Sequence, residues 1–315
     1  MENLTSLTPL EVANILNISK NTVYEMVKRG DLNSYKVGNR FRFDREDIET
    51  YKKKNKRLKE EVSVKKYNFE DDICRFEELK RNSFIICGQD ILLNTLCRHL
   101  LQKNDGVLAL NSHIGCYNSL YELYLGNAQI AAVHMWDGDS GEYNIPYVKK
   151  MLPGISAIII HLAKRKQGMY VEKGNPKNIY NWEDLKRSDI SIANREIGSG
   201  TRILLDEHLK KMSISADRVN GYKREFYSNT TAINAVVNRS SDVAIGMETH
   251  DNNSSKVDFI PLQNESLDLV IKREDFYKIQ FISVINILRS KEFKFELNNI
   301  VDYDLEEIGE IIAET

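Results

Sequence analysis

The turn at residues 194–202 carries the residue types in this chain that are best suited to chemistry. It reads Asn-Arg-Glu-Ile-Gly-Ser-Gly-Thr-Arg and leads from a β-rich run into a helix expected at 201–212. Glycine lets the backbone come close to a ligand, and a helix N-terminus presents unpaired N–H groups with a partial positive charge. With the hydroxyls of Ser199 and Thr201 beside Gly200, the turn is predicted to cradle a small oxyanion. A plain helix start is the alternative interpretation.

Five further residues are expected to complete the anion site. They follow the turn, begin predicted helices or lie in the loop before a long strand: Arg202, Ser112, Tyr143, Asn144 and Thr230. Each has a structural alternative. Arg202 either binds the anion or braces the turn through a carboxylate, Ser112 and Thr230 are equally suited to be N-caps, and Tyr143 to be packing. His113 and His134 are expected to be structural histidines rather than ligands.

Two short helices are predicted at the front of the chain. Thr8 and Glu11 have the spacing of a capping box around a first-turn proline, and Ser19 caps a second helix that ends at Gly30. Two short helices joined by a tight turn form a helix-turn-helix, whose second helix normally enters the major groove of DNA. The residues of this helix expected to contact DNA are Lys20, Asn21, Thr22, Tyr24 and Lys28.

The segment at 35–43 predicts a basic hairpin. Gly38-Asn39 is a two-residue turn, and Arg40 and Arg42 alternate with two phenylalanines, so the arginines share one face and are also expected to contact DNA. With this KVGNRFRF segment and the acidic helix start after it, residues 7–52 resemble the winged helix-turn-helix of excisionase and MerR-type proteins. A protein-interaction module is the alternative.

The charge of the chain is divided unevenly. Residues 1–60 carry a net charge of +4 and the remainder −6, although the whole chain is only −2. A basic front on an acidic body favours contact with nucleic acid through the front alone.

The body alternates short apolar runs with helical patterns, which is typical of a doubly wound α/β sheet. A long buried strand at 155–162 is predicted to cross between two lobes, and ligands in such sheets bind beyond the carboxyl ends of the strands. The predicted organisation is a winged helix-turn-helix domain at 1–57, a connector at 58–82 and an oxyanion-sensing α/β domain at 83–315.

Several segments of the body occur in a fixed order. They include NSHIG at 111–115, HMWDGDSGEYNIPYV at 134–148, KRKQGMYVEKGNPK at 164–177, NREIGSGTRILLD at 194–206 and DVAIGME at 242–248. Over residues 84–275 the series resembles the periplasmic-binding-protein-like domain of molybdate-responsive regulators. The resemblance implies a two-lobed, type II binding-protein fold that closes on molybdate or tungstate. It departs at Gln89, where related sequences carry a small hydroxyl residue.

The residue before the GSGT turn bears on which oxyanion binds. Phosphate-binding proteins share the turn but, by the same family resemblance, place an aspartate where this chain has Ile197. A molybdate dianion has no proton to donate, whereas hydrogen phosphate keeps one that favours an acceptor carboxylate. The turn therefore favours molybdate, tungstate or sulfate over phosphate, with Glu196 and Asp137 as carboxylates able to reach the site from elsewhere.

Other function classes find little support. The cysteines, Cys74, Cys87, Cys97 and Cys116, lack zinc-ligand spacing and are expected to be reduced. There is no secretory signal pattern, and the longest apolar run is far below the ~20 residues of a membrane span. We find no nucleophile elbow or acid–base pair, so no enzyme and no cofactor are expected, and the location is expected to be cytoplasmic.

Together these features predict a DNA-binding transcriptional regulator. A homodimer would change its affinity for palindromic DNA when the cleft closes on the oxyanion effector. Two alternatives remain open: an accessory protein of molybdenum-cofactor metabolism that binds oxyanion or cofactor, and a regulator that senses another small ligand such as sulfate.

Overall fold

The structure is a computed structural model that describes residues 6–60, 83–103, 108–249, 254–299 and 303–315. The chain divides into two compact units, residues 1–78 and 79–315. Most of the predicted connector at 58–82 lies outside the described residues.

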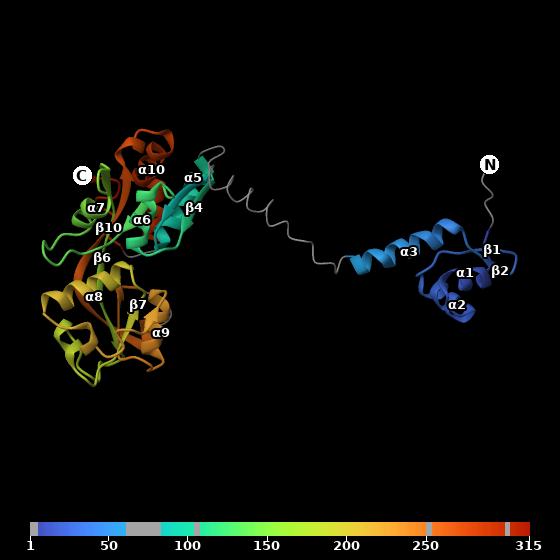
Figure 1. Ribbon diagram of the computed structural model, residues 1–315, viewed down its shortest axis with the longest axis horizontal. Coiled ribbons are helices and arrows are strands. Elements are labelled where there is room, and N and C mark those ends of the chain that lie inside the picture. The colour runs from blue at the N-terminus through green and yellow to red at the C-terminus, as the bar shows by residue number, and fades with distance from the viewer. Residues whose placement is uncertain (1–5, 61–82, 104–107, 250–253, 300–302) are drawn as a thin grey trace. The chain divides into compact units, whose positions relative to one another are not determined.

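Local sequence signals set the helix ends of the front unit (Figure 1). The first helix, α1 (Pro9–Leu16), begins at Thr8, which exchanges hydrogen bonds with Glu11 as the capping box predicts. The second, α2 (Lys20–Arg29), begins at the N-cap Ser19 and ends at Gly30, where φ is 80°. Both predicted helix starts are therefore confirmed.

The rest of the front unit is the predicted wing and a third helix. Strands β1 (Tyr35–Val37) and β2 (Arg40–Arg42) pair antiparallel, and α3 (Arg45–Glu60) follows them. One small core joins helices and wing: Val12, Ala13, Val23, Met26, Leu32, Phe43 and Ile48. The front unit is thus a helix-turn-helix with a two-stranded wing.

The second unit is built on a mixed sheet in the strand order β4-β3-β5-β10-β6-β9-β7-β8, with β11 paired to β6. The strands are β3 (Ser83–Cys87), β4 (Leu108–Ser112), β5 (Ile130–Val133), β6 (Ala157–Glu172), β7 (Ile192–Arg195), β8 (Glu225–Phe226), β9 (Val243–Met247), β10 (Val257–Lys272) and β11 (Ile311–Glu314). The helices are α5 (Ile91–Lys103), α6 (Cys116–Leu125), α7 (Ile145–Met151), α8 (Gly200–Lys211), α9 (Asn229–Val237), α10 (Ile279–Arg289) and α11 (Lys291–Asn298).

Two long antiparallel strands, β6 and β10, run through both lobes of this unit (Figure 1). Strand β10 pairs with β5 only from Asp268 onward, and β6 pairs with β9 only from Gln167 onward. We call residues 164–166 with 264–266 the hinge, residues 83–163 with 267–315 lobe one, and residues 167–263 lobe two. The strand predicted at 155–162 is present from Ala157 but continues to Glu172, and the crossing at 164–166 lies beyond the predicted range; its partner β10 completes the hinge.

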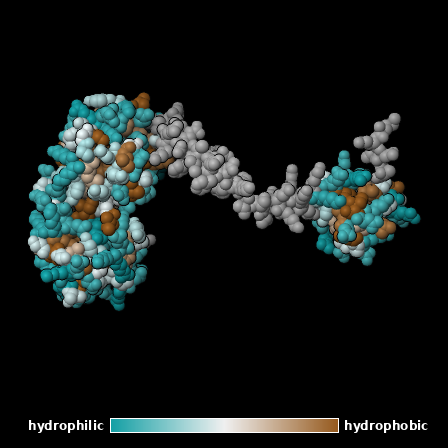
Figure 2. All heavy atoms as spheres, viewed as in Figure 1, coloured by the Kyte–Doolittle hydropathy of each residue, from teal (hydrophilic) through white to brown (hydrophobic). Residues whose placement is uncertain are grey.

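Each lobe has its own core. Leu92, Leu96 and Leu100 of α5 pack with β-strand residues in lobe one, while Leu205 and Leu209 of α8 pack in lobe two. Hydrophilic side chains cover much of the face shown in Figure 2. Among the described helices, none is long and apolar enough to cross a membrane.

Two predicted helix starts are wrong. Ser112 is the last residue of β4, and α6 begins after the N-cap Gly115, so Ser112 does not begin that helix. Ser228, not Thr230, is the N-cap of α9: its hydroxyl accepts a hydrogen bond from Thr231 N. In both places several hydroxyl or small residues compete for the cap, and the sequence does not rank them.

Candidate ligand cleft and DNA-contact face

The predicted oxyanion turn is a capped helix start in lobe two. Ser199 is the N-cap of α8: its Oγ accepts a hydrogen bond from Arg202 N at 3.2 Å and donates one to Glu196 O at 3.0 Å. The Ser199 hydroxyl is therefore engaged by the turn itself. The backbone N–H groups of Gly200 and Thr201 occupy the first two positions of the helix, where no intrahelical acceptor is available.

The starts of α6 and α8 meet across the two lobes. Tyr117 N, in the first turn of α6, donates a hydrogen bond of 3.0 Å to Gly198 O. A Cβ on Gly115 would lie 2.7 Å from the same carbonyl oxygen, and a Cβ on Gly200 would lie 2.4 Å from ring atoms of His134. Gly115 and Gly200 thus permit a close approach, but the atoms they lie against belong to the other lobe and not to a ligand.

A second contact between the lobes is polar and charged. Arg195, the last residue of β7, donates to Gln89 Oε1 of lobe one at 2.8 Å, and Gln89 Nε2 donates to Glu196 at 3.1 Å. Arg195 also donates to Asn229 and is paired with Glu196 at 2.8 Å. Burial opposes ionisation of Glu196, but its bonds to Arg195 outweigh this and lower its pKa. Gln89 is therefore a lobe-one contact residue, although it lacks the hydroxyl of related sequences.

The hinge holds a buried charge network. Glu265 of β10 accepts hydrogen bonds from Arg165 and from Gln167, the latter at 2.6 Å, and it pairs with His134 at 2.9 Å. Arg165 also pairs with Asp90 of lobe one. Burial opposes ionisation of Glu265, yet Arg165 and His134 lower its pKa to about 2.

A third contact stacks rings from both lobes. The imidazole of His208, in α8, lies between the indoles of Trp136 and Trp182, with centroid distances of 4.4 and 4.1 Å. Trp136 belongs to lobe one and Trp182 to lobe two, and the chain has no other tryptophan. Nearby, Glu207 accepts hydrogen bonds from Gly138 N and from the Tyr147 hydroxyl. Tryptophan emission therefore reports on this lobe contact.

Arg202 is engaged in bracing the turn. Its guanidinium donates to Arg195 O at 3.0 Å and to Asp206 at 3.2 Å, and it lies 4.0 Å from the ring centroid of Tyr222. These contacts match the alternative interpretation, in which Arg202 braces the turn through a carboxylate. A direct contact with an anion stays a prediction.

The other four predicted ligand residues lie on separate elements: β4, the start of α7 and α9. Asn144 is fully buried, with its amide bonded to Met135 N and to Asp268, so it ties α7 to β10. Ser112 hydrogen-bonds to Cys87, and Thr230 is exposed at the second position of α9.

Tyr143 lies closer to the lobe contact. Its hydroxyl accepts a hydrogen bond of 2.7 Å from Gln263 of lobe two, so Tyr143 links the lobes beside the hinge. Burial, with the charge of Glu265, raises its pKa. The hydroxyl therefore stays protonated and can donate to an anion.

A carboxylate is present at the lobe contact, contrary to a site made only of donors. Glu196 contacts both lobes, whereas Asp137 is held by Ser140 of its own loop and by Lys150 of α7. Among the described residues no three His, Cys, Asp or Glu side chains are grouped to hold a metal ion.

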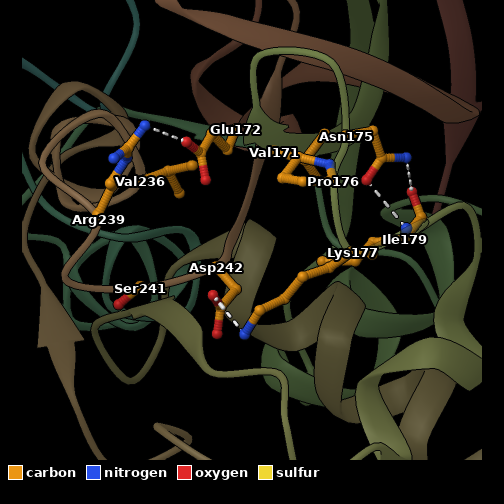
Figure 3. Close-up of a pocket in the computed structure, with 10 residues that line it drawn as sticks. All are labelled: Val171, Glu172, Asn175, Pro176, Lys177, Ile179, Val236, Arg239, Ser241 and Asp242. Atoms are coloured by element: carbon orange, nitrogen blue, oxygen red, sulfur yellow. Dashed lines mark hydrogen bonds and ion pairs between the residues drawn. The ribbon is translucent and has the colours of Figure 1, made fainter.

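A small hollow of about 30 Å³ lies elsewhere in lobe two, at the amino end of β9 (Figure 3). Ion pairs join Lys177 to Asp242 and Arg239 to Glu172 around it. This volume fits about one water molecule, and the hollow is at the opposite end of the strand from the lobe contacts. It is not a candidate for the ligand site.

The sequence predictions missed the charged residues that join the lobes: Arg165, Arg195 and Glu265. One signal was available for Arg165. In β6, Lys164 and Lys166 are exposed while Arg165 and Gln167 are buried, so the alternation of a strand places Arg165 inward.

The predicted DNA-contact residues share one region of the front unit. Lys20, Asn21, Tyr24 and Lys28 are exposed on α2, and Arg40 is exposed on β2, while Thr22 and Arg42 are half-buried. The rings of Tyr24 and Phe41 make an edge contact with centroids 5.9 Å apart, which joins α2 to the wing. The wing therefore packs against α2 through Phe41, while Arg40 and Arg42 alternate with it on β2.

Comparisons with known proteins support this two-part organisation. A helix-turn-helix domain family matches residues 6–56, and the PBP superfamily domain matches residues 97–289. The chain is 38% identical over 315 residues to the uncharacterized protein YvgK of Bacillus subtilis (strain 168), with all of both chains covered.

Solved structures share the fold of the second unit. A putative phosphate transporter substrate-binding protein from Clostridium perfringens, with bound phosphate, has a TM-score of 0.52 at 16% identity, covering 69% of this chain and 97% of that one. The ancestral amino-acid-binding protein AncCDT-1 has a TM-score of 0.51 at 16% identity, covering 71% and 97%. The chain therefore belongs to the PBP superfamily, with a helix-turn-helix domain in front of its two-lobed binding-protein domain.

Proposed function

We propose that this chain is a transcriptional regulator whose DNA binding changes when a small oxyanion, molybdate or tungstate, binds between the two lobes. The observation that carries this proposal is the meeting of the α6 and α8 N-termini across the lobes, in a chain that also carries a helix-turn-helix. Two helix N-termini supply N–H donors and positive ends of helix dipoles to one place, which suits an anion.

The proposed donors are the N–H groups of Gly200, Thr201 and Tyr117 and the guanidinium of Arg195. Two of them are engaged by acceptors of the protein itself: Tyr117 N by Gly198 O, and Arg195 by Glu196. An incoming oxyanion must replace these acceptors, so its binding changes the lobe contact. Four charge-assisted bonds of roughly 1.5–3 kcal/mol each support micromolar binding after ordering costs.

The choice among oxyanions rests on Ile197 and on the resemblance to molybdate-responsive regulators. Glu196 is an acceptor close to the turn, and a protonated phosphate would use it. Sulfate and phosphate are therefore the necessary competitors in any binding test.

Thermal unfolding with each of the four anions, followed by tryptophan emission, tests the ligand. An anion at ~100 times its Kd adds about 2.7 kcal/mol of stability. Arg195→Met should abolish the shift. Arg239→Met is the matched control, because Arg239 makes an exposed ion pair with Glu172 in the same lobe. A flat response to all four anions contradicts the oxyanion proposal.

Gel shifts on DNA upstream of the protein's own gene test the regulator. We expect a homodimer to bind, with affinity altered by the oxyanion. The accessory-protein alternative predicts anion binding with no DNA site and no effect of Lys20→Ala or Arg40→Ala. The proposed role is binding rather than catalysis.

A further inference from the structure

A cysteine, a histidine and a glutamate form a hydrogen-bonded series at the contact between the lobes. Cys116 is the first residue of α6, and its sulfur accepts hydrogen bonds from the ring and the backbone N–H of His134. His134 follows β5, and its Nδ1 lies 2.9 Å from Glu265 Oε2. Because Nδ1 is engaged by the carboxylate, Nε2 is the ring nitrogen left for the sulfur.

The carboxylate of this series is held in place. Glu265 accepts hydrogen bonds from the side chains of Arg165 and Gln167, and its side chain is fully buried. A carboxylate fixed in this way orients the imidazole and stabilises its protonated form. The arrangement is that of an activated thiol: nucleophile, base and a third group that orients the base.

The charge state of the series follows from these contacts. Burial opposes ionisation of Cys116, but His134 outweighs it and lowers the thiol pKa. Burial likewise disfavours the protonated imidazole, yet Cys116 and Glu265 raise the pKa of His134 to about 10. In contrast, burial raises the pKa of Cys87 and of Cys97 to about 11.

The surroundings favour a small reactant. The Cys116 side chain is only 4% exposed, and Gly200 of lobe two covers the imidazole so closely that a Cβ would overlap it. The N-terminus of α6 adds a positive field at the sulfur, which stabilises a thiolate.

We propose that Cys116 is an oxidation site that reacts with small hydroperoxides, with His134 and Glu265 as its positioning residues. The thiolate attacks one peroxide oxygen, so that an S–O bond forms and the O–O bond breaks. The sulfur loses two electrons to the peroxide, and the leaving hydroxide or alkoxide takes a proton from the His134 imidazolium. The products are Cys116 sulfenic acid and water or an alcohol. Oxidation of Cys116 requires no bound oxyanion or DNA, although Cys116 adjoins Tyr117, one of the proposed oxyanion donors.

Trapping of sulfenic acid with dimedone in the full chain tests the proposal. The protein carries Cys74→Ser, since Cys74 lies outside the described residues, and is treated with hydrogen peroxide at about pH 6 before peptide mass spectrometry. At this pH His134 favours the Cys116 thiolate, whereas burial disfavours the Cys97 thiolate, so Cys116 should be labelled at least about tenfold faster than Cys97.

Two variants keep the test decisive. His134→Gln should slow labelling of Cys116 to the rate of Cys97, while Cys87→Ser, the matched control, should leave it unchanged. The ultraviolet absorbance of the thiolate is compared between the wild type and Cys116→Ser near pH 7. It detects the ionised sulfur without requiring a reagent to reach it. The proposal is overturned if Cys116 and Cys97 are labelled at equal rates, or if Cys116→Ser has the same thiolate absorbance as the wild type.

Discussion

Replacing Gly200 by alanine tests the lobe contact separately from the fold of either lobe. The added Cβ would lie 2.4 Å from Cε1 and Nδ1 of His134 and 2.6 Å from its carbonyl oxygen, whereas ordinary contact begins at 3.4 Å. The ring is held by Glu265 and the carbonyl is backbone, so neither moves easily. Gly200 itself has no positive φ, so alanine is acceptable to α8 on its own.

The two opposing effects can be compared. Alanine at a compatible glycine stabilises by about 0.4–1 kcal/mol, while overpacking costs about 1–3 kcal/mol. We expect a net loss of about 1–2 kcal/mol in the free energy of unfolding, and a Tm lower by about 2–8 °C for a unit of this size. The lobes can also separate and so avoid the clash. The loss of stability is then no larger than the free energy of the contact between the lobes, and emission from Trp136 and Trp182 changes without unfolding.

Gly246→Ala is the matched control. A Cβ at Gly246, in β9, would have its nearest neighbour at an ordinary 3.6 Å, so this variant should be as stable as the wild type or slightly more. Gly115→Ala introduces a clash at the same contact from the lobe-one side, where its Cβ would lie 2.7 Å from Gly198 O. The double variant with Gly200→Ala should lose less than the sum of the single losses, because separated lobes no longer clash. Unchanged stability and unchanged emission in Gly200→Ala would refute the closed lobe contact.

Four further predictions concern the hinge, the turn and the DNA-binding unit. Glu265 has a folded-state pKa of about 2, below its ordinary 4.5, so its ionisation contributes about 3 kcal/mol that is present above about pH 4.5 and lost as the pH falls toward 2. Glu265→Gln should flatten the pH dependence of Tm in that window, and equal slopes contradict this. Arg202→Met removes the brace of the turn and should cost about 1–3 kcal/mol in thermal unfolding, with wild-type stability as the contrary result. Lys20→Ala and Arg40→Ala should each lower the salt slope of DNA affinity by about 1 if both contact phosphates, and an unchanged slope excludes that contact. Glu196→Gln weakens the internal competitor for the guanidinium beside it and should tighten oxyanion binding in calorimetry, whereas weaker binding would make Glu196 a ligand residue.

Much of the front unit could be predicted from sequence because its signals are local. The capping box of Thr8 and Glu11 and the Gly38-Asn39 turn each act within a few residues. The lobe-one part of β6 was also predicted, since its apolar run is long, but the polar residues at 164–166 that cross between the lobes were not. These features depend on neighbours along the chain, and no distant contact was needed to see them.

The lobe contacts depend on distant pairs. Arg165 and Glu265 are a hundred residues apart and meet only because β6 and β10 pair in one register. Nothing in the sequence fixes that register in advance. Gly200 shows a different limit: its type correctly indicated that something comes close to the backbone. It could not indicate that the close group is His134 of the other lobe.

Two of the proposed oxyanion donors at the lobe contact already have acceptors within the protein. Tyr117 N has a carbonyl oxygen and Arg195 has a carboxylate, and both acceptors belong to the turn that was predicted to hold the oxyanion. A ligand that replaces them gains only the difference between two sets of bonds, so its apparent affinity is lower than the donors alone would give. The same exchange separates the Gly198 carbonyl from α6, which couples ligand binding to lobe position. A cleft whose donors were free would bind more tightly, but it would lack this coupling.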